Sequence, residues 1–224
     1  MRPALFILAY FEFFGEKTAL LFGLTLSRFI ALISPFYLAV RGRFDDAIAE
    51  SKIALEIDPN SLKYQKLNGD ILFLARRYDE AILQLKRVVE VDENFATAYG
   101  NLWLSHELKG DNAGAFEWFM KNQKRANSEY IELYQNAYET AGWQGVRQKL
   151  LELEKLNEQK PSGNYYRLAR QSVMLGDKER AFAYLNKAVE KHHGQLIMLN
   201  VEPSFDSLHD DPRFDELVRR VGLK

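Results

Sequence analysis

Residues 42–60 and 76–94 read GRFDDAIAESKIALEIDPN and RRYDEAILQLKRVVEVDEN, and the second stretch follows the first by 34 residues (76 − 42 = 34). The same step links three alanines, Ala47, Ala81 and Ala115 (81 − 47 = 34; 115 − 81 = 34). A constant period of this length indicates one helix pair per repeat, because each pair buries its apolar face only against its neighbours. The sequence therefore predicts an all-α solenoid.

About five units of this kind fit between residues 28 and 192. The repeated alanines predict places where two helices cross closely, with aromatic side chains filling the space beside them. Gly42 and Gly110 fall between the two helices of a unit, where we expect a positive φ. The fourth unit is irregular, with Gly142 in its turn and Arg147 where the other units carry the alanine.

The pattern resembles the tetratricopeptide repeat (TPR), in which Trp-x-x-Leu-Gly-x-x-Tyr is followed by Ala, Phe and Pro over about 34 residues. The match covers residues 28–192, is best in the second helix of each unit, and keeps the closing proline only at Pro59. The resemblance implies a right-handed α-α superhelix in which the first helices line a groove. It also implies a non-enzymatic scaffold or adaptor that binds a peptide or domain of a partner protein there.

The C-terminal stretch LNVEPSFDSLHDDPRFDELVRRVGL, residues 199–223, carries a second resemblance. It is similar to the end of TPR arrays in bacterial multidomain transcriptional regulators and Ser/Thr kinases, with His209 where that family usually has Arg. Asp211 is expected to cap a short helix beginning at Pro212. The apolar residues of that helix share one side: they are Phe214, Leu217, Val218 and Val221. Residues 193–224 are therefore predicted to be a capping segment.

The N-terminal segment, residues 1–27, is far more apolar than the rest of the chain. The first repeat that follows it is apolar on both sides of its first helix, so something must cover that helix. We expect the segment to be helical and to pack there, against Phe29, Leu32 and Phe36. A membrane anchor, a homodimer interface and a secretory signal are the alternatives.

The composition argues against several classes of function. Lys and Arg total 30 and Asp and Glu total 31, so no net field favours nucleic acid. There is no cysteine, which excludes disulfides and thiolate metal sites. No catalytic motif is present, and we expect a cytoplasmic protein that is not an enzyme and has no cofactor or metal, with membrane association as the alternative location. A phosphoester-cleaving metal site using His192 or His193 with His209 and Asp210 is a third hypothesis.

The repeat register predicts which first-helix side chains face the groove. They are Lys63, Lys66, Asp70, Phe73, Asn101, Glu107, Tyr166, Arg167 and Arg170. Some members of the family grip the C-terminal carboxylate of a chaperone with paired Lys, Asn and Arg, but Asp70 would place negative charge beside that carboxylate. The mixture favours a peptide of another partner protein, with the aromatic and Arg residues as the strongest contacts.

Overall fold

The computed structural model describes residues 31–156, 158 and 164–223. Helices build this described part, which contains no strand. They are α3 (Phe44–Ile57), α4 (Leu62–Leu74), α5 (Tyr78–Val91), α6 (Ala96–Leu108), α7 (Asn112–Arg125), α8 (Ile131–Lys155), α9 (Tyr165–Met174), α10 (Lys178–Glu190), the 3₁₀ turns η1 (Gly194–Met198) and η2 (Pro203–Leu208), and α11 (Pro212–Val221). Residues 31–40 form a further helical stretch before α3.

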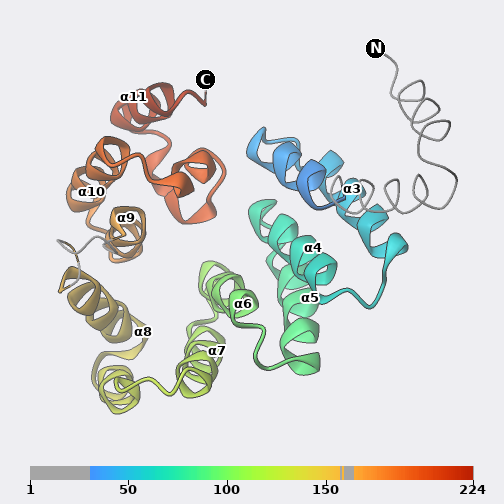
Figure 1. Cartoon of the computed structure of the whole chain (residues 1–224). Helices are drawn as coiled ribbons and strands as arrows, with labels where there is room; N and C mark the ends of the chain where they lie inside the picture. Colours follow the sequence, from blue (N-terminus) through green and yellow to red (C-terminus); the bar gives the residue numbers. More distant parts are fainter. Residues whose placement is uncertain (1–30, 157, 159–163, 224) are drawn as a thin grey trace, which may run out of the picture.

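Successive helices pack on one another, and Figure 1 shows that they follow an arc rather than surrounding one central core. The predicted all-α solenoid is confirmed. The repeated alanines explain the close packing, because Ala47, Ala81, Ala115 and Ala181 are all 0% exposed. A larger side chain at these positions would separate the two helices of a pair.

The turns within the pairs share a left-handed backbone conformation. Gly42, Gly110 and Gly176 have φ of 72°, 89° and 80°, as expected for the first two. Gly142 has φ 60° and breaks α8 into two helical halves, so the irregular fourth unit is also a helix pair. Arg76 occupies the same turn position with φ 61°, a conformation that disfavours a side chain.

The C-terminal segment explains why an arginine is kept in that turn. Arg76 Nε donates to Asp206 Oδ2 at 3.1 Å, and Arg76 Nη1 donates to the carbonyl oxygen of Val201 at 3.1 Å. Val201 belongs to the same apolar core as α4–α7, while Phe205 packs edge-on against Tyr166 of α9 at 5.2 Å. The stretch from η1 to η2 therefore lies on the inner side of the arc and connects α9 with the turn between α4 and α5 (Figure 1).

The last helix agrees with its predicted role. Asp211 accepts a hydrogen bond from the backbone N–H of Arg213, and Pro212 begins α11. Phe214, Leu217 and Val218 are buried, and α11 packs on α10. The capping helix is thus confirmed, although the residues before it also line the inside of the arc.

The first helical stretch shows apolar side chains to solvent on both of its sides. Leu32 is 37%, Ile33 48% and Tyr37 60% exposed, whereas Ala39 is buried. Residues 1–27, which were predicted to cover this helix, and Phe29, one of the residues predicted to be covered, lie outside the described residues. None of the helices in the described part is both long and apolar enough for a membrane span.

Candidate functional site

The inner face of the arc begins with a polar network between α4 and α6. Lys66 forms an ion pair with Asp70, and Asn101 Nδ2 donates to Asp70 Oδ1 at 2.9 Å. Burial raises the pKa of Asp70, while the ammonium of Lys66 opposes the rise. Three predicted residues are therefore brought together, and their charges are already largely matched.

A second network surrounds Arg147, which projects from the second half of α8 between α6 and α9. Its Nε donates to Glu107 Oε1 at 2.8 Å, a second nitrogen bonds Oε2, and a third donates to Gln171 Oε1. Its guanidinium carbon lies 4.8 Å from the ring centre of Trp103 and 5.5 Å from that of Trp143. Burial lowers the pKa of Arg147, but arginine starts high enough to stay charged.

Two donors on α9 lack acceptors. Within the described part of the chain, neither the hydroxyl of Tyr166 nor Nε of Arg170 has a hydrogen-bond partner, although both atoms are buried. Burial raises the pKa of Tyr166, and the nearby carboxylate of Glu202 adds to the rise, so the hydroxyl keeps its proton. Such orphaned donors are rare in folded proteins and indicate a place where an acceptor is missing.

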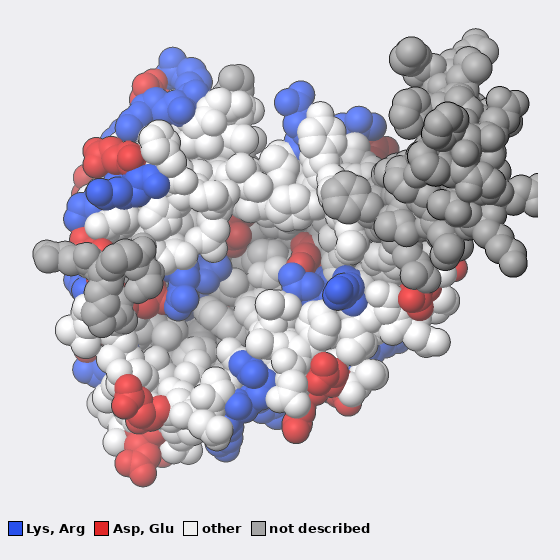
Figure 2. Space-filling model, viewed as in Figure 1, with Lys and Arg blue, Asp and Glu red and all other residues white. Residues whose placement is uncertain are grey.

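Charged side chains surround the hollow in the middle of the inner face (Figure 2). Lys63 is exposed on α4, and Arg167 on α9 is exposed and bonds Glu154 Oε1 through Nε at 3.1 Å. Arg170 is half-buried and has no acidic partner among the residues that the structure describes. The accessible part of the inner face is thus richest in unmatched positive charge at Lys63 and Arg170.

The burial of three predicted groove residues corrects their expected role. Phe73 is 1%, Tyr166 2% and Glu107 8% exposed, so none offers an open surface to a partner. Phe73 lies in the core beside Tyr78, and Phe205 of the chain's own C-terminal segment packs on Tyr166. Phe205 covers Tyr166 from the inside of the arc, whereas Phe73 packs within its own helix pair and Glu107 binds Arg147 of α8.

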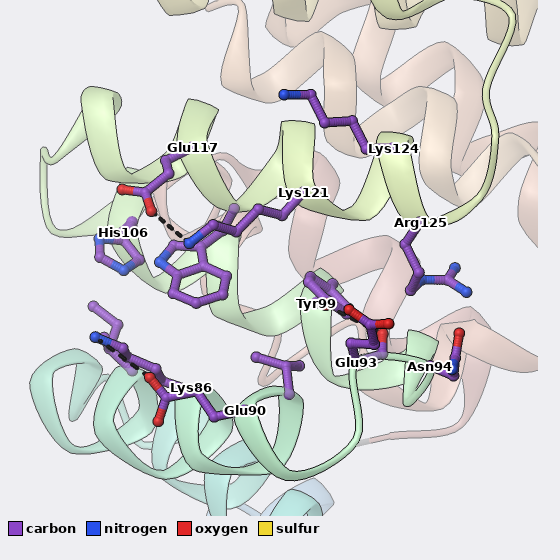
Figure 3. A pocket seen from close by; sticks show the side chains of 13 residues that line it. Lys86, Glu90, Glu93, Asn94, Tyr99, His106, Glu117, Lys121, Lys124 and Arg125 are labelled. Carbon is purple, nitrogen blue, oxygen red and sulfur yellow. Dashed lines mark hydrogen bonds and ion pairs between the residues drawn. The ribbon is translucent and has the colours of Figure 1, made fainter.

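A second concave surface lies on the other side of the helix layer, between α5 and α7, and has a volume of about 750 Å³. Figure 3 shows α5 with Lys86 and Glu90 on one side and α7 with Lys121 on the other. Tyr99 and His106 reach it from α6. We call this surface the α5–α7 groove; its remaining lining residues are Ile82, Val89, Glu93, Asn94, Glu117, Trp118, Lys124 and Arg125.

Sequence reasoning missed the α5–α7 groove, although the basic run KNQKR, residues 121–125, lies at one end of it. The run ends α7. Lys121 lies 4.0 Å from the ring centre of Trp118, and Arg125 lies 5.9 Å from that of Tyr99. The sequence did contain a signal for this groove: Lys121 and Arg125 lie on the same face of the helix as Trp118.

Comparisons with known proteins add no identification: no family model and no curated protein matches the chain. Within the described ranges, no three His, Cys, Asp or Glu side chains come close enough to hold a metal ion. The two concave surfaces are therefore the features from which a function can be argued.

Proposed function

We propose that this protein is a non-enzymatic interaction scaffold of the TPR type, which binds a segment of a partner protein on the inner face of its arc. The observation that carries the proposal is the half-buried Arg170 on α9, which has no acidic partner among the described residues and whose Nε lacks an acceptor there. Solenoids of stacked helix pairs present extended concave surfaces that other proteins use for binding. Unmatched polar groups on such a surface are satisfied when a partner supplies the complementary group.

The charges of the inner face favour an acidic partner segment. Lys63 and Arg170 have no acidic partner among the described residues, whereas Lys66 and Arg167 are paired with Asp70 and Glu154. A carboxylate or backbone carbonyl that reaches Arg170 would form a charge-assisted hydrogen bond, which is stronger than a neutral one. Reaching the hydroxyl of Tyr166 would also require the C-terminal segment around Phe205 to shift, because Phe205 packs on that ring.

Charge reversal at Arg170 tests the inner face. Partner proteins are first identified by crosslinking them to the purified chain in a cell extract. The affinity of the chain for each partner is then measured with both proteins purified. We expect Arg170→Glu to weaken this binding by about 2–5 kcal/mol. Arg87→Glu is the matched control, because Arg87 is exposed on α5 and lines neither concave surface. If Arg170→Glu and Lys66→Glu both bind as tightly as the unaltered chain, the inner face is not the binding site.

A second candidate function, a self-assembling or membrane-associated adaptor, is favoured by the first helical stretch. Leu32, Ile33 and Tyr37 are exposed apolar residues on a single short helix, and clustered apolar exposure marks interaction sites. Two measurements on the full chain distinguish self-assembly from membrane association. Light scattering during size-exclusion chromatography detects self-assembly, and liposome flotation detects membrane association. A monomer that does not float with liposomes contradicts both. The cytoplasmic location and the bacterial origin stay predictions.

A further inference from the structure

The α5–α7 groove has an apolar floor. Val89 is 5% and Trp118 is 7% exposed, and Tyr99 contributes the edge of its ring beside them. Lys121 covers part of Trp118 through a cation–π contact at 4.0 Å. An apolar floor under a movable charged side chain suits an apolar anchor from a partner, because burying such a side chain removes apolar surface from water.

One end of the groove carries unmatched positive charge. Lys86 lies 3.7 Å from Glu90, and Lys121 donates to Glu117 at 2.6 Å, so these four charges are paired. Lys124 and Arg125, at the C-terminal end of α7, have no acidic partner within the described part of the chain. Figure 3 shows Arg125 at this end near Asn94 and Glu93, with the side chain of Lys124 extending away from it. The positive charge here favours an acidic group on whatever lies across this end.

Glu93 faces the same end and limits what can bind there. Its backbone carbonyl accepts from the hydroxyl of Tyr99 at 3.2 Å, and its carboxylate has no basic partner among the described residues. Together with Glu90 and Glu117 it places acidic groups along the rim. A continuous polyanion such as nucleic acid would meet repulsion from these carboxylates, whereas a peptide can place a single acid against Lys124 and Arg125.

The other end of the groove offers a hydrogen-bond acceptor. His106 Nδ1 lies 2.7 Å from Asp111 Oδ2. The backbone N–H of Gly114 and the ring of His106 lower the pKa of Asp111, so this carboxylate is an acceptor and Nδ1 carries the proton. Nε2 of His106 is then a buried acceptor with no partner among the described residues, and the His106 side chain lines this end of the groove.

The length of the groove defines the size of the ligand. His106 lies against Gly114, where an added Cβ would collide with the ring, and Arg125 is 11 residues further along α7 (125 − 114 = 11). At about 1.5 Å per residue this is about 16 Å. An extended chain rises about 3.3 Å per residue, so about five residues span the distance.

We propose that the α5–α7 groove binds an extended peptide segment of a partner protein, about five residues long, with an acidic side chain beside Lys124 and Arg125 and an apolar side chain over Val89 and Trp118. This surface is separate from the inner face, so the protein would join two partner segments, one on each side of the helix layer. The proposal does not depend on the inner face being a binding site.

Two blocked hexapeptides test the proposal on the full chain: one alternates Glu and Leu, and the other alternates Lys and Leu. Binding is followed by calorimetry and by tryptophan fluorescence, because Trp118 forms part of the floor. We expect the acidic peptide to bind and to perturb the fluorescence, and Trp118→Phe to remove that perturbation. The double variant Lys124→Glu/Arg125→Glu should weaken the acidic peptide about tenfold or more.

Two variants act as controls for this test. Arg87→Glu reverses one positive charge on α5 outside the groove and should leave the affinity unchanged. Glu93→Gln removes the opposing carboxylate and should tighten binding about two- to threefold, a gain that an unfolded protein cannot show. The proposal is overturned if the acidic peptide does not bind at about 1 mM, if the basic peptide binds as well, or if a single-stranded oligonucleotide binds more tightly than the acidic peptide.

Discussion

The same repeat position holds a small apolar residue in the regular helix pairs and a charged residue in the irregular one. The regular pairs are α4–α5 and α6–α7, and the irregular pair is formed by the two halves of α8. Ala81 and Ala115 are 0% exposed where the helices of the regular pairs cross. In α8 the equivalent residue is Arg147, which is also 0% exposed. In the fourth pair this position is therefore buried without being small, because neighbouring helices supply partners for the arginine.

The partners of Arg147 come from outside its own pair. Glu107 and Trp103 lie on α6, and Gln171 lies on α9. A buried ion pair of this kind adds little stability compared with an apolar core, but removing one partner is costly because a buried charge is left alone. The regular pairs thus depend on close contact, and the fourth pair depends on a network that joins three helices.

The largest loss of stability is expected for Arg147→Ala. The change leaves Glu107 charged, buried and without its partner, and we expect the free energy of unfolding to fall by about 3–5 kcal/mol. Urea unfolding followed by circular dichroism measures the loss. A loss below about 1 kcal/mol would mean that Glu107 turns to solvent and that the network contributes little.

The double variant Arg147→Met/Glu107→Met separates charge from volume. Because both charges are removed together, no buried ion is left unpaired, and we expect most of the lost stability to return. A double variant as unstable as Arg147→Ala would show that packing against Trp103 and Trp143, rather than charge pairing, sets the cost.

Two glycine substitutions test how closely the helices of the regular pairs are packed. An added Cβ on Gly69 of α4 would lie 2.7 Å from Cγ of Leu85, which is fully buried and cannot move away. We expect Gly69→Ala to destabilise by about 1–3 kcal/mol. Gly100 of α6 has nothing within 4 Å of such a Cβ, so Gly100→Ala should stabilise by about 0.5–1 kcal/mol. Thermal unfolding of the two variants should shift in opposite directions.

The turn at Arg76 allows backbone strain to be separated from a side-chain contact. Arg76→Gly relieves the positive φ but loses the bonds to Asp206 and Val201, so its effect on global stability should be within about 1 kcal/mol. Arg76→Ala keeps the strain and loses the same bonds, so it should be the less stable variant. Hydrogen exchange in η2 should rise equally in both. Unequal exchange would mean that the turn conformation, not the arginine side chain, holds the C-terminal segment.

The smallest expected effect is a pH dependence at the capping helix. Hydrogen bonds from the side chain and then the backbone of Arg213 lower the pKa of Asp211 to about 2, from an ordinary 3.8. Since the folded pKa lies below the unfolded one, this stabilisation is complete above about pH 4 and is lost as the pH falls towards 2. After correction for intrinsic exchange, which slows as the pH falls, amide exchange in α11 should therefore increase between pH 5 and about pH 2.

Asp211→Asn is the control for that prediction. Asparagine also caps helices well, but it does not titrate. The variant should show a smaller increase in α11 exchange over the same pH range than the unaltered chain. An identical increase in both would assign the acid sensitivity to other carboxylates, among them Glu179, whose pKa is also lowered by Arg213.

Much of the fold could be predicted because its signals are local. The 34-residue step predicted the crossings at Ala81 and Ala115 and the turns at Gly42 and Gly110, and the Asp-Pro pair predicted the cap at Asp211. Each depends on contacts within one helix pair or between neighbouring pairs. The same register assigned the groove residues to one side of the first helices, but it cannot show whether other parts of the chain bury them.

The sequence by itself therefore determined the solenoid: helix pairs in a fixed register, small residues at their crossings, glycines in their turns and a capped end. Only the tertiary structure decided what lies inside the arc and where a partner can reach. Arg147 meets Glu107 from 40 residues away, and Arg76 meets Asp206 from 130 residues away. The physical reason is that such contacts depend on the curvature accumulated over several helix pairs. No single repeat carries that curvature in its sequence pattern.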